Sequence, residues 1–158
     1  MTAKDKSYQT LCLALESLIG EEPDALANLS NSAALLFHSM ESINWAGFYL
    51  YKDGQLVLGP FQGKPACIRI PMGKGVCGTS ASTGKPLIIA DVHRFAGHIA
   101  CDAESASEAV VPLFKAGRLV GVLDVDSPLQ SRFDESDRAG LEQYAAILSA
   151  AVHWEDLL

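Results

Sequence analysis

The amino-acid sequence predicts an α+β fold, with an antiparallel sheet of five or six strands and N- and C-terminal helices packed on one face. Apolar residues recur at helical spacing near both ends of the chain, whereas the middle consists of short extended runs. Tight turns join several of these runs, as hairpin connections require. A length of 158 residues fits one hydrophobic core, so we expect a single domain over 1–158.

Three helices are expected outside the sheet, over 5–19, from Pro23 to about Met40, and over 133–154. In the first, apolar residues recur at intervals of three and four: Tyr8, Leu11, Leu15 and Leu18. Gly20 ends that pattern. Asp134 is a suitable N-cap for the last helix, because its carboxylate can accept a hydrogen bond from the first turn.

Six strands are expected, at 43–51, 55–61, 66–70, 86–90, 107–114 and 118–126. The turn at Asp53 and Gly54 predicts a hairpin, because this pair adopts the positive φ angles that such turns need. The stretch 73–81 is rich in glycine and small residues and predicts a short helix packed close to neighbouring backbone. Residues 91–105 show no period, which is typical of a lid or binding loop.

Composition excludes some classes of partner. The net charge of −7 argues against nucleic acid and against an anionic membrane, because both bind basic surfaces. The first residues contain no apolar signal-peptide region, and no later run approaches the ~18 apolar residues of a membrane span. We therefore expect a cytoplasmic protein.

The sequence contains four cysteines: Cys12, Cys67, Cys77 and Cys101. In a reducing compartment a permanent disulfide is disfavoured, but a transient catalytic one is possible. Cys12 lies on or beside an apolar helical stripe and is expected in the core. Cys101 lies in the long loop among ionisable residues, which indicates a reactive thiol.

A structural metal site is disfavoured, because no two cysteines have the C-x2-C spacing of a zinc knuckle. His93 and His98 lie near Cys101 in the sequence and could in principle complete such a site. We expect no metal and no organic cofactor.

Two carboxylates share one face of the last predicted strand. Strand alternation puts Asp124 and Asp126 on the same side as Val120 and Val122, with Leu119, Leu123 and Val125 on the other. If the hairpin pairs through its short turn, Glu108 reaches the same region. The group is either a solvated strand end or an acidic pocket that holds a small cation and supplies a proton.

Two aromatic residues, Trp45 and Tyr49, lie four apart in a predicted strand and point to one face. They could form a wall of such a pocket, or they could be ordinary core residues.

Six segments in order resemble the free methionine-(R)-sulfoxide reductases, a family built on the GAF domain: WAGFY (45–49), GPFQG (59–63), ACIRI (66–70), GKGVCGTSA (73–81), HIACD (98–102) and GVLDVDS (121–127). The similarity covers nearly the whole chain. It implies a GAF fold with a six-stranded antiparallel sheet and a pocket for one molecule of free methionine sulfoxide.

The resemblance also implies roles for particular residues. Cys101 matches the catalytic cysteine, Cys67 the main resolving cysteine and Cys77 a third cysteine that can assist. Trp45 matches the residue that packs on the sulfoxide methyl group, with Tyr49 beside it. Three acidic residues match those that bind the ammonium group and polarise the sulfoxide: Glu108, Asp124 and Asp126.

The implied reaction begins when the Cys101 thiolate attacks the sulfoxide sulfur, which releases methionine and leaves a sulfenic acid. A resolving cysteine then forms a disulfide, which thioredoxin reduces. The family also implies a possible homodimer. The alternative is a GAF module that binds a small ligand or senses redox state without turnover, because fold does not fix function.

Overall fold

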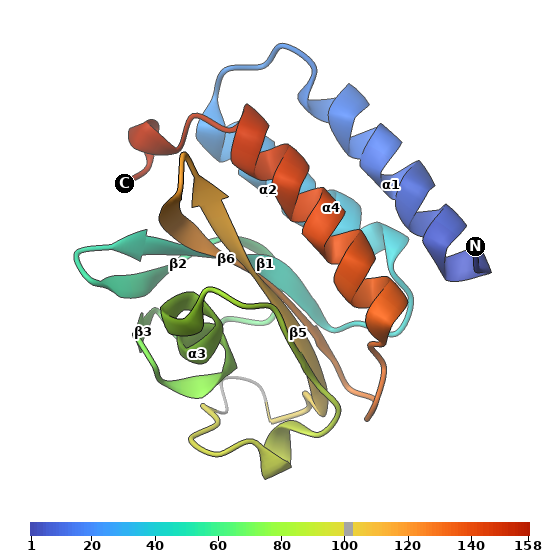
Figure 1. The fold of residues 1–158 in the computed structure, drawn as a ribbon, viewed down its shortest axis with the longest axis vertical. Coiled ribbons are helices and arrows are strands. Elements are labelled where there is room, and N and C mark those ends of the chain that lie inside the picture. Colours follow the sequence, from blue (N-terminus) through green and yellow to red (C-terminus); the bar gives the residue numbers. More distant parts are fainter. Residues whose placement is uncertain (100–102) are drawn as a thin grey trace.

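The computed structural model describes residues 1–99 and 103–158, which form a six-stranded antiparallel sheet in the order β3-β2-β1-β6-β5-β4 (Figure 1). The strands are β1 (Trp45–Lys52), β2 (Gln55–Gly63), β3 (Arg69–Pro71), β4 (Leu87–Ile89), β5 (Ser107–Lys115) and β6 (Arg118–Ser127). The helices are α1 (Ala3–Ile19), α2 (Ala25–Ser39), α3 (Gly75–Thr83) and α4 (Glu135–Ala151), with 3₁₀ turns η1 (Val92–Arg94) and η2 (Trp154–Asp156).

The two faces of the sheet carry different layers. Helices α1, α2 and α4 lie together on one face, and α3 lies on the other (Figure 1). The helix-covered face contains the larger core, in which several large side chains are fully buried: Leu15, Leu29, Phe48, Leu123 and Tyr144. The α+β prediction and the packing of the terminal helices on one face are therefore confirmed. Cys12 lies in this core, as expected.

None of the helices in the described parts of the chain has both the length and the apolar character that crossing a bilayer requires.

Capping boxes mark where two of the helices begin. Thr2 and Asp5 form a capping box at α1, and Asp134 and Asp137 form one at α4, so the predicted N-cap Asp134 is confirmed. Helix α4 ends at Ala151, before the predicted end at 154. The chain turns out of the helix there, and the indole of Trp154 is buried with its Nε1 donating to the Ser149 carbonyl at 3.2 Å.

The strand predicted at 66–70 was wrong in its bounds, because β3 spans only Arg69–Pro71. Strand β2 can form few backbone hydrogen bonds to residues 66–68. The Leu58 amide donates to the Ile68 carbonyl at 2.9 Å, but two residues further Pro60 has no N–H to donate. The residues that precede Arg69, among them Cys67, therefore form a loop at the end of the sheet.

A β-bulge interrupts the alternation of β6. The pairing with β5 shifts between Leu113 and Phe114, which leaves Val120 as an extra residue. Val120 packs on the helix-covered face, and Leu119 packs on the face with α3. The alternation over 118–126 predicted the reverse for these two residues and was wrong, because one extra residue moves the preceding side chains to the opposite face.

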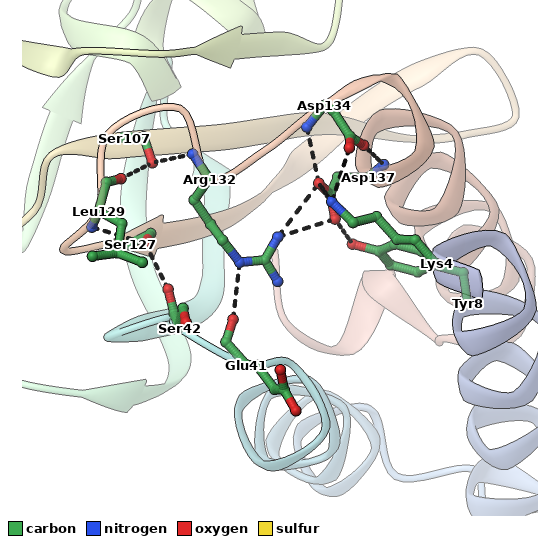
Figure 2. A network of polar contacts seen from close by, with 10 residues as sticks. All are labelled: Lys4, Tyr8, Glu41, Ser42, Ser107, Ser127, Leu129, Arg132, Asp134 and Asp137. Atoms are coloured by element: carbon green, nitrogen blue, oxygen red, sulfur yellow. Dashed lines mark hydrogen bonds and ion pairs between the residues drawn. The ribbon is translucent and has the colours of Figure 1, made fainter. Parts of the chain in front are cut away.

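A buried carboxylate, Asp137, joins the helical layer to the loop after β6 (Figure 2). Its side chain is 1 % exposed and accepts hydrogen bonds from the Tyr8 hydroxyl at 2.7 Å and from the Lys4 ammonium at 2.8 Å. The Arg132 guanidinium lies 3.4 Å from the same carboxylate and also donates to the Glu41 carbonyl. This one side chain therefore ties α1, α4 and the chain before β1 together.

We expect Asp137→Ala to lower the free energy of unfolding by about 3 kcal/mol, because it leaves the buried Tyr8 hydroxyl without its partner and removes one partner each from Lys4 and Arg132. Urea unfolding followed by circular dichroism measures this. The matched control is Glu135→Ala in the same first turn, whose exposed carboxylate should matter by less than about 1 kcal/mol. Equal losses in the two variants would contradict a central role for Asp137.

Candidate active site

A small pocket opens on the face of the sheet that carries α3. Its volume is about 50 Å³, and one water molecule needs roughly 10–15 Å³ on the same scale. The pocket therefore suits a small molecule rather than a folded segment of polypeptide. The described residues that line it are Trp45, Tyr49, Pro65, Ala66, Ile70, Lys74, Gly75, Val76, Cys77, His98, Ile99, Ser105, Glu108, Asp124 and Asp126.

Two aromatic side chains of β1 form one wall of the pocket. The rings of Trp45 and Tyr49 stack with centroids 5.9 Å apart, and Phe61 stacks on Trp45 at 5.2 Å. The indole Nε1 donates to the Lys64 carbonyl at 3.1 Å, and the Tyr49 hydroxyl donates to the Cys67 carbonyl at 2.9 Å. Both aromatic rings are thus held in place by polar contacts as well as by stacking.

Three carboxyl groups lie together on the floor, where β5 pairs with β6. Glu108 pairs with Asp126, and Val110 pairs with Asp124, so the three acidic residues occupy one face. Glu108 is 7 % exposed and Asp124 is 5 % exposed. The structure therefore brings together the acidic residues that the sequence placed on one face, and it places them in a pocket rather than at a solvated strand end.

Burial raises the pKa of Glu108 and of Asp124 well above the ordinary range of a carboxyl group, and repulsion from the neighbouring carboxylate raises each pKa further. Both groups thus keep their protons at a pH where an exposed carboxyl group is ionised. Among the described residues, the Asp124 Oδ1 atom has no hydrogen-bond partner. A protonated acid in such a pocket can donate a proton to an oxygen atom of a bound molecule.

Helix α3 brings Cys77 to the same floor. Its thiol lies 3.8 Å from Glu108 Oε2, and burial together with the nearby carboxyl groups raises the pKa of this thiol well above its ordinary value. The helix can pack this closely because residue 78 is glycine. A Cβ atom there would lie 2.5 Å from the Pro71 carbonyl oxygen, which confirms the expected close packing of the small-residue segment.

Of the other cysteines, the structure describes Cys12 and Cys67. Cys67 is half-buried in the loop before β3 and is disulfide-bonded. It is not among the described lining residues, but its neighbour Ala66 is. Cys101 lies outside the described residues. Cys12 and Cys77 are free thiols.

One group of described residues is close enough to hold a metal ion: Cys77, Glu108 and Asp124 offer ligand atoms within 4.8 Å of one another. His93 and His98 do not belong to this group. Their rings lie edge to face with centroids 6.4 Å apart. The site considered around these histidines includes Cys101, which lies outside the described residues.

Sequence analysis missed Lys74, which is exposed and lines the pocket. It occupies the N-cap position of α3, where no side chain caps the helix. The glycines at 73 and 75 had indicated only close backbone packing. The positive charge of Lys74 at the start of a predicted helix was the available signal for anion binding.

Comparisons with known proteins agree with this architecture. A family model described as GAF domain matches residues 27–153. The chain is 48% identical to the free methionine-R-sulfoxide reductase of Escherichia coli, over 97% of this chain and 93% of that protein.

Solved structures are similar throughout the chain. The structure named fRMsr of Staphylococcus aureus, in complex with substrate, is 50% identical, with a TM-score of 0.87 over 91% of this chain and 94% of that one. The structure of free methionine-R-sulfoxide reductase from Neisseria meningitidis, in complex with its substrate, is 43% identical, with a TM-score of 0.91. The match covers 96% of this chain and 91% of that one. This chain therefore belongs to the GAF domain family and, within it, to the free methionine-R-sulfoxide reductases.

We expect the free energy of unfolding of Asp124→Asn, measured relative to that of the unchanged protein, to increase with pH. Between the ordinary pKa of an aspartate and the raised pKa of Asp124, the unfolded chain releases a proton that the folded chain keeps. The free energy of unfolding of the unchanged protein therefore falls as pH rises, and asparagine removes this loss.

Urea unfolding at about pH 5 and pH 8 should show the difference between variant and unchanged protein growing by about 1 kcal/mol or more. Glu21→Gln, which removes an exposed carboxyl group, is the control. A difference that is independent of pH would contradict a raised pKa at Asp124.

Proposed function

We propose that this protein reduces free L-methionine (R)-S-oxide to L-methionine. The observation that carries the proposal is the pocket floor, where the buried carboxyl groups of Glu108 and Asp124 face the space beside Trp45. Such a pocket can bind an ammonium group, protonate a sulfoxide oxygen and hold an apolar methyl group against an aromatic ring. The named activities of the similar proteins from E. coli and N. meningitidis support the same reaction.

The distribution of charge supports a free amino acid as the substrate. Acidic groups line the floor, and Lys74 lines the exposed rim at the start of α3. A lysine and the N-terminal end of a helix both favour a carboxylate. The ammonium end of a zwitterion thus finds carboxyl oxygens that can accept its hydrogen bonds, and its carboxylate end finds a cation, whereas a methionine within a polypeptide has neither charged end.

The proposed chemistry uses cysteines without a metal. The Cys101 thiolate attacks the sulfoxide sulfur, and an acid on the pocket floor protonates the oxygen. Methionine leaves, and the oxygen remains on Cys101 as a sulfenic acid. Cys67 then attacks this sulfur, water leaves, and the resulting disulfide is reduced by exchange with the dithiol of thioredoxin.

The state of the cysteines favours Cys67 over Cys77 as the first resolving residue. Cys67 is disulfide-bonded, whereas Cys77 is a free thiol. Burial and three nearby carboxyl groups raise the pKa of Cys77, which disfavours the thiolate that would have to attack. Cys77 therefore serves as the slower alternative.

The activity is tested by NADPH consumption coupled through thioredoxin and its reductase. We expect turnover of L-methionine-(R)-sulfoxide, but not of its S epimer or its N-acetylated R form. The carboxamide of L-methionine-(R)-sulfoxide should reach half of its maximal rate only at a higher concentration than the free amino acid, because it lacks the carboxylate. Cys101→Ser should abolish turnover, and Cys12→Ser in the helix-side core should retain it. If fully reduced protein turns over none of these compounds, the reductase is ruled out and a ligand-binding GAF sensor becomes the better account.

The order of the cysteines is tested by one turnover followed by labelling with dimedone, which reacts with sulfenic acids. In Cys67→Ser we expect the label on Cys101 and a thioredoxin-supported rate at least ten-fold lower. Cys77→Ser should show no label and a nearly unchanged rate. The opposite pattern would assign the first disulfide to Cys77.

A further inference from the structure

The floor of the pocket is also suited to a metal ion. Three potential ligands converge there from different elements: the Cys77 thiol from α3, the Glu108 carboxyl from β5 and the Asp124 carboxyl from β6. Their ligand atoms lie within 4.8 Å of one another, and all three residues are buried. A sulfur and two oxygens held by three packed elements form a set of ligands that is largely ordered in advance.

The spacing is close to what zinc requires. Zinc binds thiolate sulfur at about 2.3 Å and carboxylate oxygen at about 2.0–2.2 Å, so a tetrahedral ion holds sulfur and oxygen roughly 3.6 Å apart. Cys77 Sγ lies 3.8 Å from Glu108 Oε2. This pair therefore needs only a small side-chain movement, whereas the group as a whole, whose ligand atoms lie within 4.8 Å of one another, must draw somewhat closer around the ion.

A separate observation indicates that this cluster lacks a partner. Asp124 is 95 % buried, and its Oδ1 atom has no hydrogen-bond partner among the described residues, although it faces a pocket. Buried polar atoms are almost always paired, so an orphan atom beside a cavity indicates a ligand. The ion pairs of the described part of the chain also leave Glu108 and Asp124 without a lysine or arginine.

We propose that Cys77, Glu108 and Asp124 bind one thiophilic divalent cation of the zinc type, and that this ion blocks the pocket and inhibits the protein. The thiol and the protonated carboxyl groups release their protons to solvent as their bonds to the metal form, and no atom changes its oxidation state. Sulfur among the ligands selects zinc over magnesium or calcium. The inhibitory part rests on the proposed function, because it requires the same carboxyl groups to hold the substrate, whereas the binding part does not.

Binding is tested with Co²⁺ as a spectroscopic substitute for zinc, added to fully reduced protein without chelators. We expect a thiolate-to-cobalt absorption band in the near ultraviolet that saturates at one equivalent and disappears when Zn²⁺ is added. The band should be absent in Cys77→Ser and unchanged in the control Cys12→Ser. A band that survives in Cys77→Ser, or that is lost instead in Cys101→Ser, would overturn the proposed site.

A second variant guards against misfolding of Cys77→Ser. Asp124→Asn keeps the thiol, and calorimetric titration with Zn²⁺ should show at least ten-fold weaker binding. Unchanged zinc affinity in this variant would exclude Asp124 as a ligand and overturn the three-residue site.

Inhibition is tested in single turnovers of pre-reduced protein, which need no thioredoxin. Zn²⁺ should raise the concentration of methionine sulfoxide that gives half the maximal rate, without lowering that maximal rate, and Mg²⁺ should have no effect. Zinc that binds at one equivalent without changing the half-saturating concentration would overturn the inhibitory role. Absence of turnover without any metal would refute the proposed function alone, since the cobalt titration tests the site independently.

Discussion

The antiparallel pairing of β5 with β6 is the constraint on which the site depends. It sets Glu108 opposite Asp126 and places Asp124 on the same face, where like charges repel. A sheet holds such a group only if its register is fixed from elsewhere. Two serines next to the acidic residues help to fix this register. Ser107, which precedes Glu108, donates to the Leu129 carbonyl, and Ser127, which follows Asp126, donates to the Ser42 carbonyl (Figure 2).

The other face of the sheet supplies the stability that this arrangement requires. The core beneath α1, α2 and α4 consists of buried apolar side chains, and the buried carboxylate beside it, Asp137, is surrounded by donors. Asp124 on the opposite face is also buried, but its Oδ1 atom has no hydrogen-bond partner within the described parts of the chain. Asp137 is thus satisfied by neighbouring donors, whereas the described residues leave one oxygen of Asp124 without a donor.

Regular periods could be predicted from the sequence because they depend on local spacing. The helices, the Asp134 cap and the shared face of Asp124 and Asp126 all follow from a repeat of 3.6 or of two residues. The bulge at Val120 could not be predicted, since an extra residue is visible only against the partner strand. Lys74 was missed for a related reason, because only the folded chain brings the start of α3 to the rim above the acidic floor.

The division of the sheet into two faces also has a consequence for how this fold can change. Side chains that shape the pocket come from one set of alternating positions, and those that hold the helices come from the other. Substitutions confined to the pocket set leave the packing of the helical layer intact. A protein engineer could therefore vary the aromatic wall and the rim of the pocket in a combinatorial library, to accept other small sulfoxides. The core on the opposite face would keep such variants folded.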